Sequence, residues 1–322
     1  MHVRTWLPLS LRPLVGAFVL LLLPLSAQAD AVRMAVLGDS ISAGSGGKNW
    51  VGQLNSTFPG EIAFQNEAKG GATSTTVVSG QLSKVVLSAK NGLLDNSVLI
   101  IGGNDATGVN ALSIALGGDP APFINTYVNN VKQVIDSIAG AGPGVRQVFG
   151  NMPDVTLTPR VQDEAAGYGI TPAQLQLLSD AIGEANAQAN AYALSHNVPV
   201  LDLYGAGSLI LTSSSFTLGG HTYTTPFASD EFHPATWVQG LLANMVNTAF
   251  NVHWGQSLPI LSDQQITKNA GFTPNAGATY YDVTPFILFP VPEPASCVLL
   301  LTGSLVLGTV VLRTRLRRSA AR

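Results

Sequence analysis

Short apolar runs recur along the chain and alternate with longer stretches of helical periodicity. The apolar runs predict five strands: Val32–Leu37, Glu61–Asn66, Ser97–Ile101, Arg146–Asn151 and Val198–Leu203. Most of these runs are continuously apolar, which is typical of strands that are buried on both faces. The pattern therefore predicts an α/β fold in which helices cover both faces of a parallel sheet.

The helical periodicity is clearest in four segments: Trp50–Thr57, Pro122–Ala139, Thr171–His196 and Ala235–Asn251. The third segment begins with a capping threonine, a proline in the first helical position and a glutamine at the third. Between these elements, the weakly periodic stretch Thr156–Gly169 and the Ser-, Thr- and Gly-rich stretch Ser208–Thr225 predict loops around the mouth of a site. We expect the polar stretch Ser262–Tyr281 to be a terminal excursion.

The N-terminal end has the pattern of an export signal. Arg4 and Arg12 precede the apolar stretch Leu14–Leu25, and the small-residue pattern Ala27-Gln28-Ala29 follows it. Residues 1–29 are therefore predicted to be a cleaved signal peptide, with an uncleaved membrane anchor as the alternative.

The C-terminal end carries a second apolar segment, residues 295–312, which is long enough to cross a bilayer. Five arginines follow it and would hold that end on the cytoplasmic side, and Pro292-Glu293-Pro294 precedes it. This three-part ending resembles the PEP-CTERM sorting signal of Gram-negative bacteria. The resemblance implies an exosortase-type processing enzyme as a partner, transient anchoring through 295–312, and display on the cell surface, in the matrix or in the medium. A plain C-terminal anchor is the alternative.

The chain is thus expected to consist of a signal peptide at 1–29, one domain at 30–290 and a sorting tail at 291–322. Seven of its 16 basic residues lie in the end segments, so residues 30–294 carry nine basic and 19 acidic side chains, a net charge of −10. Such an acidic body repels phosphate backbones, which argues against nucleic-acid binding. The single cysteine, Cys297, lies in the tail, so the body has neither a disulfide nor a thiolate nucleophile.

Candidate chemistry begins where the first strand ends, at Gly38-Asp39-Ser40. Open α/β folds build their sites at the carboxyl ends of parallel strands, so Ser40 is a candidate nucleophile if a base can take its proton. His233, between Asp230 and Pro234, is the candidate base. The three-residue spacing can place the Asp230 carboxylate beside one nitrogen of the imidazole while the other nitrogen points outward.

Two further segments follow strands. Gly70 and Gly71 allow a turn with exposed backbone N–H groups, although a glycine pair between a strand and a helix is more often purely structural. In Gly102-Gly103-Asn104-Asp105, the Asn104 amide can donate a hydrogen bond into a site, or the segment can cap the next helix.

Together these four segments resemble, in the same order, the blocks of the SGNH hydrolase family within the GDSL esterases and lipases. The resemblance implies a flavodoxin-like three-layer α/β/α sandwich with a five-stranded parallel sheet. It also implies the catalytic residues Ser40, Asp230 and His233, with an oxyanion hole formed by the N–H groups of Ser40 and Gly71 and the side-chain amide of Asn104. Because Lys69-Gly70 precedes Gly71, Gly70 is the alternative N–H donor. No cofactor or metal is implied.

We therefore expect an exported serine hydrolase that cleaves carboxylic esters through an acyl-serine intermediate. The substrate would be a lipid, a short-chain ester or an acylated polysaccharide. The alternative is a surface or matrix carbohydrate-binding module that uses the same fold without significant hydrolysis.

Overall fold

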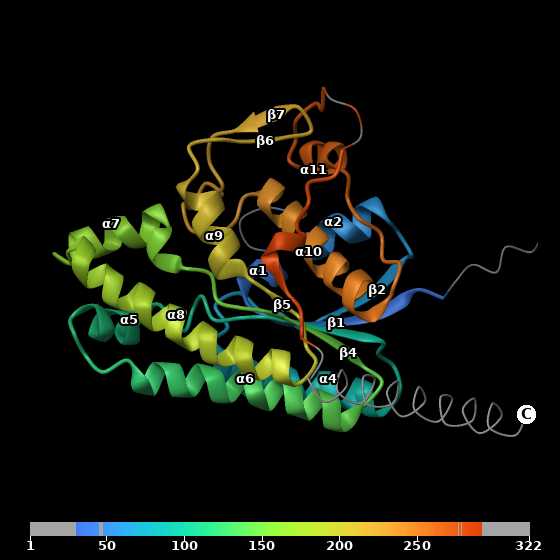
Figure 1. The fold of residues 1–322 in the computed structure, drawn as a ribbon, viewed down its shortest axis with the longest axis horizontal. Helices are drawn as coiled ribbons and strands as arrows, with labels where there is room; N and C mark the ends of the chain where they lie inside the picture. The colour runs from blue at the N-terminus through green and yellow to red at the C-terminus, as the bar shows by residue number, and fades with distance from the viewer. Residues whose placement is uncertain (1–29, 45–47, 276, 278, 292–322) are drawn as a thin grey trace, which may run out of the picture. The chain divides into compact units, whose positions relative to one another are not determined.

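Helices pack on both faces of a central sheet in the computed structural model, which describes residues 30–44, 48–275, 277 and 279–291 (Figure 1). The chain divides into Met1–Asp30 and Ala31–Arg322, and the sheet with its helices belongs to the second unit. The predicted signal peptide and the predicted span at 295–312 lie outside the described residues. In the part of the chain that is described, no helix combines the length and apolarity needed to cross a membrane.

The sheet has the strand order β2-β1-β3-β4-β5-β8. Its strands are β1 (Val32–Gly38), β2 (Ile62–Asn66), β3 (Asn96–Ile100), β4 (Arg146–Gly150), β5 (Val200–Leu201) and β8 (Ile287–Leu288). The first five are parallel, which confirms the predicted α/β fold with a parallel sheet. The sequence did not indicate β8, a two-residue strand that runs antiparallel to β5 at the edge.

Side chains of β1 alternate between two core layers. Ala35 and Leu37 pack with α4 (Leu82–Lys90), α6 (Ala121–Ala141) and α8 (Pro172–Ser195) on one face of the sheet. Met34 and Val36 pack with α2 (Trp50–Thr57) and α10 (Thr236–Trp254) on the other face. Figure 1 shows the two groups of helices on opposite sides of the strands, so this unit is a three-layer sandwich.

Shorter elements connect these layers. They are α1 (Ser40–Ala43), α3 (Ser74–Thr76), the π-helical turn η1 (Val77–Gln81), α5 (Gly108–Ala115), the 3₁₀ turns η2 (Val155–Leu157) and η3 (Thr284–Phe286), α7 (Pro159–Gly167), α9 (Leu203–Thr212), the hairpin β6 (Phe216–Leu218) and β7 (His221–Tyr223), and α11 (Asp263–Asn269).

The expectation of loops was wrong in two places. Thr156–Gly169 contains the end of η2 and the helix α7, and Ser208–Thr225 contains the end of α9 and the β6–β7 hairpin. Ser262–Tyr281, which was expected to be a terminal excursion, contains α11. Most of α7 is exposed and Ala165 is its one buried residue, so little of its sequence marks it as part of the core. By contrast, the cap at the start of α8 is confirmed, because Thr171 and Gln174 form a reciprocal capping box.

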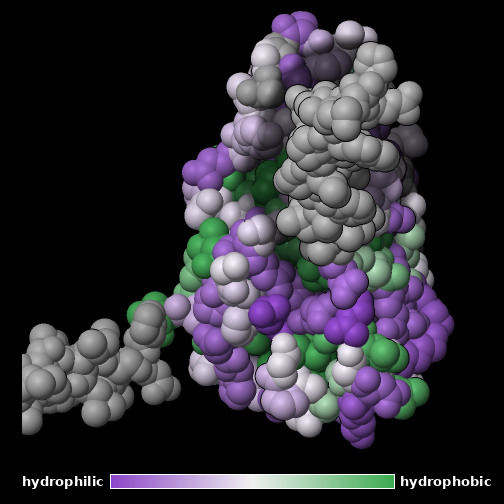
Figure 2. Space-filling model, turned by 90° about the vertical axis from the view of Figure 1, so that its right-hand side faces the viewer, coloured by the Kyte–Doolittle hydropathy of each residue, from purple (hydrophilic) through white to green (hydrophobic). Residues whose placement is uncertain are grey.

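The surface is mixed in polarity. Hydrophilic residues cover much of the coloured area on the face seen in Figure 2, and hydrophobic residues form smaller patches between them. This distribution is ordinary for a domain whose large apolar side chains fill two core layers.

Candidate active site

Ser40 is held at the junction between β1 and α1. The preceding Asp39 caps α1, and its carboxylate accepts a hydrogen bond of 3.0 Å from the Ile41 N–H. Gly38 packs so closely on β3 that a Cβ atom there would lie 2.0 Å from the Ile100 carbonyl oxygen. Only glycine therefore fits at the strand end that delivers the serine. Ser40 itself is buried, with 6% of its surface exposed.

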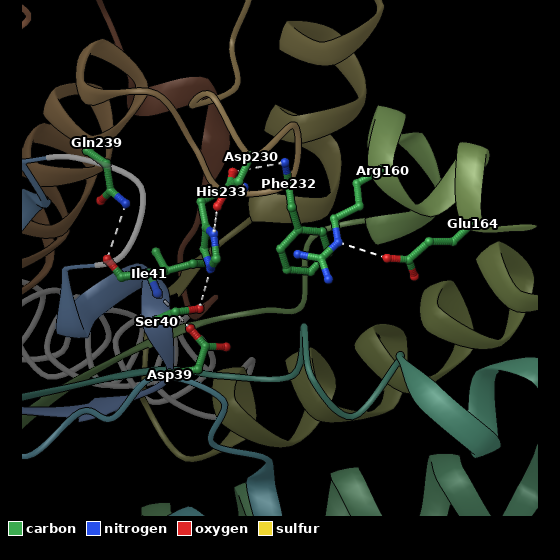
Figure 3. A network of polar contacts seen from close by, with 9 residues as sticks. All are labelled: Asp39, Ser40, Ile41, Arg160, Glu164, Asp230, Phe232, His233 and Gln239. Atoms are coloured by element: carbon green, nitrogen blue, oxygen red, sulfur yellow. Dashed lines mark hydrogen bonds and ion pairs between the residues drawn. The ribbon is translucent and has the colours of Figure 1, made fainter.

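A chain of hydrogen bonds joins Ser40 to the turn before α10 (Figure 3). The His233 Nε2 lies 2.8 Å from the Ser40 Oγ, and its Nδ1 lies 2.5 Å from the Asp230 Oδ2. The other oxygen of Asp230 accepts hydrogen bonds from the backbone N–H groups of Phe232 and His233. Ser40 and the Asp230-x-x-His233 turn, which were predicted from two distant segments, thus meet in one contiguous arrangement.

The Asp230 carboxyl is charged in this setting. Burial alone would raise its pKa, but the hydrogen bonds from the His233 ring and from two backbone N–H groups outweigh that effect and lower the pKa to about 2. The carboxylate therefore remains an acceptor that fixes the His233 tautomer and favours a positive charge on the ring.

Two other carboxyls near the site, those of Asp39 and Asp105, have raised rather than lowered pKa values. Burial raises the pKa of Asp39 to about 7, although the hydrogen bond from Ile41 opposes the shift. Burial also raises the pKa of Asp105, which accepts hydrogen bonds of 2.8 and 2.6 Å from the Ser74 N–H and hydroxyl. Both side chains hold loops rather than contact the Ser40 hydroxyl.

The predicted oxyanion residues lie on neighbouring loops. The Asn104 amide donates 3.0 Å to the Ala72 carbonyl, which ties the loop after β3 to the glycine turn after β2. Gly71 has a φ of 74° in that turn, which favours glycine. Among the described hydrogen bonds, none joins Ser40 to Gly70 or Gly71, so the identity of the N–H donor stays a prediction.

Two buried glutamines hold the backbone on either side of Asp39 and Ser40. The sequence pattern did not indicate this role for either of them. Gln81, in the π-helical turn η1, accepts from the Gly38 N–H at 2.9 Å and donates to its carbonyl at 2.8 Å. Gln239 on α10 donates to the Ile41 carbonyl and accepts from the Trp50 N–H. A polar residue on the buried face of α10 was a detectable signal for Gln239, whereas nothing in the pattern marked Gln81.

Helix α7 contacts the turn that carries Asp230 and His233. The Arg160 guanidinium lies 5.7 Å from the centroid of the Phe232 ring, and the Arg160 N–H donates to the Glu231 carbonyl. Arg160 Nε also donates 2.9 Å to Glu164, one helical turn further on (Figure 3). These contacts fasten the segment that carries Asp230 and His233.

Two hollows border Asn104, and Ser40 belongs to the wall of one of them. A narrow cavity of about 120 Å³ has Ser40, His233 and Asn104 in its wall, and apolar side chains of α9 and α10 form a large part of the rest. A roomier hollow of about 460 Å³ also includes Asn104, but threonines dominate its wall: Thr73, Thr75, Thr107 and Thr126. Within the described residues, no cluster of three or more His, Cys, Asp or Glu side chains could hold a metal ion.

The arrangement suits nucleophilic chemistry. A serine hydroxyl hydrogen-bonded to an imidazole can lose its proton as it attacks a carbonyl, and a carboxylate on the far nitrogen stabilises the imidazolium that forms.

Comparison with known proteins gives a family and a set of similar structures. The family model described as "GDSL-like Lipase/Acylhydrolase family" matches residues 36–236, a range that includes Ser40, Gly71, Asn104, Asp230 and His233. No curated protein sequence matches the chain significantly. Similar solved structures include an extracellular lipase from Streptomyces rimosus, with 20% identity, a TM-score of 0.46, and coverage of 68% of this chain and 100% of that one. Another is phospholipase A1 from Streptomyces albidoflavus, with 17% identity, a TM-score of 0.43, and coverage of 70% and 98%.

Proposed function

The chain belongs to the GDSL-like lipase/acylhydrolase family and is a carboxylic ester hydrolase, and we propose that Ser40 is its nucleophile and that it acts outside the cytoplasm. The observation that carries the first part is the hydrogen-bonded chain from the Ser40 hydroxyl through His233 to Asp230. The natural substrate would be a lipid, a short-chain ester or an acylated polysaccharide.

The proposed reaction has two halves. His233 Nε2 takes the proton of Ser40 as Oγ attacks the ester carbonyl carbon, and it then protonates the departing alcohol. The acyl group stays on Ser40 as an ester. Water repeats the sequence on that ester, releases the carboxylic acid and restores the serine. The negative charge on the carbonyl oxygen would be held by the N–H groups of Ser40 and Gly71 and by the Asn104 amide.

Hydrolysis of p-nitrophenyl butyrate by the wild type and by Ser40→Ala tests the nucleophile. Ser79→Ala, at an exposed serine on η1, is the matched control. We expect Ser40→Ala to abolish measurable turnover while Ser79→Ala retains the wild-type rate. A fluorophosphonate should also label the wild type, with the adduct on the peptide that contains Ser40. Equal turnover by Ser40→Ala and wild type, or an adduct elsewhere, would refute the assignment.

The binding-module alternative predicts a different outcome of the same experiment. A carbohydrate-binding module would bind polysaccharide with similar affinity in the wild type and in Ser40→Ala, and neither would turn over esters. The complete set of Ser40, His233 and Asp230 in hydrogen-bond contact supports the enzyme instead, because binding alone needs no such chain.

Location outside the cytoplasm is proposed from the two end segments of the sequence. Export and processing would leave a mature chain that begins at Asp30 and ends near Pro294, with the net charge of −10 given above. Intact-mass measurement of the protein recovered from the producing cell tests this directly. A full-length mass of 322 residues in the cytoplasmic fraction would refute export.

A further inference from the structure

The narrow cavity beside Ser40 is walled by two helices that lie on the same face of the sheet. Ala206, Gly207 and Ile210 line it from α9. The wall from α10 includes Leu241, Leu242 and Met245. Because Ser40 and His233 also belong to the wall, a group attached to the serine oxygen can enter the cavity.

The cavity wall presents few free polar groups to a polar ligand. Two carboxyls in its wall are engaged within the protein: Asp39 accepts from the Ile41 N–H, and Asp154 accepts from Thr156 and Ser179. Most of the other lining side chains are aliphatic or aromatic. An apolar wall of this kind favours a hydrocarbon chain over a hydroxylated one.

We propose that this cavity is the acyl pocket of the enzyme and that it restricts the substrate to short acyl esters. The proposal rests on the proposed function. A dry apolar cavity of roughly 150 Å³ holds benzene, a molecule of six carbons. By the same measure, the volume of about 120 Å³ suits roughly five carbons beyond the reacting carbonyl. Butyryl to hexanoyl groups therefore fit, and chains of ten carbons or more do not.

The alternative assignment, in which the alcohol enters this cavity, conflicts with the second hollow. The hollow lined by threonines shares Asn104 with the cavity, leaves more room for water-sized groups (about 460 against 120 Å³), and presents hydroxyl groups. It can take a hydrophilic alcohol that the narrow apolar cavity would exclude. The leaving alcohol must also depart and water must enter before the acyl group is released, and the roomier side suits both.

Gly207 sets the length limit in this proposal. It lies inside α9, and a Cβ atom added there would meet only the Leu211 Cδ1, at an ordinary contact distance of 3.9 Å. A larger side chain can therefore be placed without a clash at the backbone, and it would occupy the cavity. Replacing glycine inside a helix also favours folding, so a lost activity would not reflect a weakened helix.

The experiment measures kcat/KM of the full chain for p-nitrophenyl esters of two, four, six, eight, ten and twelve carbons. Each methylene buried in the pocket is expected to raise kcat/KM by roughly fourfold, up to the hexanoate. Beyond the octanoate the value should fall. In Gly207→Leu, the ratio of kcat/KM for hexanoate to that for acetate should fall at least tenfold.

The opposite change is made with Met245→Ala, which enlarges the cavity and should move the optimum to eight or ten carbons. Two matched controls should keep the wild-type profile. Gly140→Leu makes the same change as Gly207→Leu at an exposed position of α6, where a Cβ atom meets nothing within 4 Å. Met34→Ala removes a buried methionine that does not line the cavity.

Binding to the inactive Ser40→Ala protein provides a readout that does not depend on catalysis. Calorimetry with hexan-1-ol should show binding to Ser40→Ala and none to the double variant with Gly207→Leu. An active enzyme whose optimum lies at ten or more carbons, or whose profile Gly207→Leu leaves unchanged, would overturn the pocket assignment alone. Failure of the proposed function would instead appear as equal ester turnover by the wild type and by Ser40→Ala. If neither protein hydrolyses the esters, equal binding of hexan-1-ol by Ser40→Ala with and without Gly207→Leu would overturn the pocket assignment.

Discussion

At the scale of single residues, Asn104 joins the loop after β3 to the glycine turn after β2. Its amide donates to the Ala72 carbonyl and its side chain borders both hollows. If it holds the developing oxyanion, Asn104→Ala should lower kcat by roughly 10²- to 10³-fold with little change in KM, because the donor acts mainly on the charged oxygen. Steady-state kinetics with p-nitrophenyl butyrate measure the split.

Asn110→Ala provides the control for Asn104→Ala, because Asn110 lines the same threonine-rich hollow from the exposed side of α5. It should change kcat by less than about twofold, as expected of a surface substitution. A raised KM with an unchanged kcat in Asn104→Ala would mean that the amide binds substrate rather than the oxyanion.

A second prediction at this scale concerns pH. Burial raises the pKa of Asp39 to about 7, above the value of about 3.9 for an unfolded aspartate. For a group with a raised folded-state pKa, the stability contribution is fully present below pH 4. It is lost as the pH rises towards 7, by about 4 kcal/mol at most. The melting temperature should therefore decline from pH 4 to 7 through this group.

Asp39→Asn tests this pH dependence, because asparagine caps a helix about as well as aspartate but does not ionise. We expect the variant to melt higher than the wild type at pH 8 and to differ little from it at pH 4. Melting curves across this range decide the point, and parallel pH profiles for the two proteins would show that Asp39 does not titrate in the folded state.

At the scale of elements, the π-helical turn η1 holds the strand end that leads to Ser40, through Gln81. In Gln81→Leu the buried Gly38 N–H loses its partner, which should cost about 1–3 kcal/mol of folding free energy. Because Gly38 fixes the approach to Ser40, kcat should fall as well. Urea unfolding and steady-state kinetics measure the two effects.

Gln188→Leu, at an exposed position of α8, is the control for Gln81→Leu. It should shift the free energy of unfolding by less than about 0.5 kcal/mol. A Gln81→Leu protein as stable and as active as this control would show that η1 does not position the serine.

The elements also show which parts of the fold a sequence can reveal. Most of the five parallel strands and the four predicted helices were predictable because they supply apolar residues to the two core layers, although β2 has only Ile62 buried. The helix α7 is mostly exposed, and α9 follows a two-residue strand in a stretch rich in Ser and Gly, so local pattern favoured loops at both.

The residues of the candidate site also divide into those that the sequence indicates and those that it does not. Ser40, Asn104 and the Asp230-x-x-His233 turn lie at strand or helix ends, where local sequence indicates them. Gln81 and Gln239 act on backbone groups 43 and 198 residues away in the sequence, and such long-range bonds leave no local pattern. The acyl cavity depends on how α9 and α10 are placed around Ser40, which periodicity does not encode.

At the scale of the whole domain, the last described segment closes the sheet and supports the cavity. Ile287 pairs with Leu201 of β5, and Val283 and Ile287 are buried in the core layer that contains α10. The Phe286 carbonyl accepts from the N–H of Asp202, the residue that caps α9. The segment after Asp282 thus holds the helix that lines the acyl cavity.

Two truncated proteins test this role. Among the described residues, the buried members of both core layers lie between 34 and 287, so residues 30–291 should keep the wild-type melting temperature and ester profile. Residues 30–281 lose the burial of Val283 and Ile287, at about 1.5–3 kcal/mol each. They also uncover the edge of β5 and release the cap of α9.

Two substitutions at neighbouring positions distinguish the effect of losing a buried side chain from the effect of shortening the chain. Ile287→Ala removes a buried side chain and should cost about 2–5 kcal/mol, whereas the side chain of Leu288 is 36% exposed, so Leu288→Ala should cost less than about 1 kcal/mol. If this segment holds α9 in place, Ile287→Ala should also lower the ratio of kcat/KM for the hexanoate ester to that for the decanoate ester. Leu288→Ala should leave this ratio unchanged. Equal unfolding free energies for the two variants would mean that β8 covers the sheet edge without supporting the core. The acyl cavity would then depend on α9 and α10 alone.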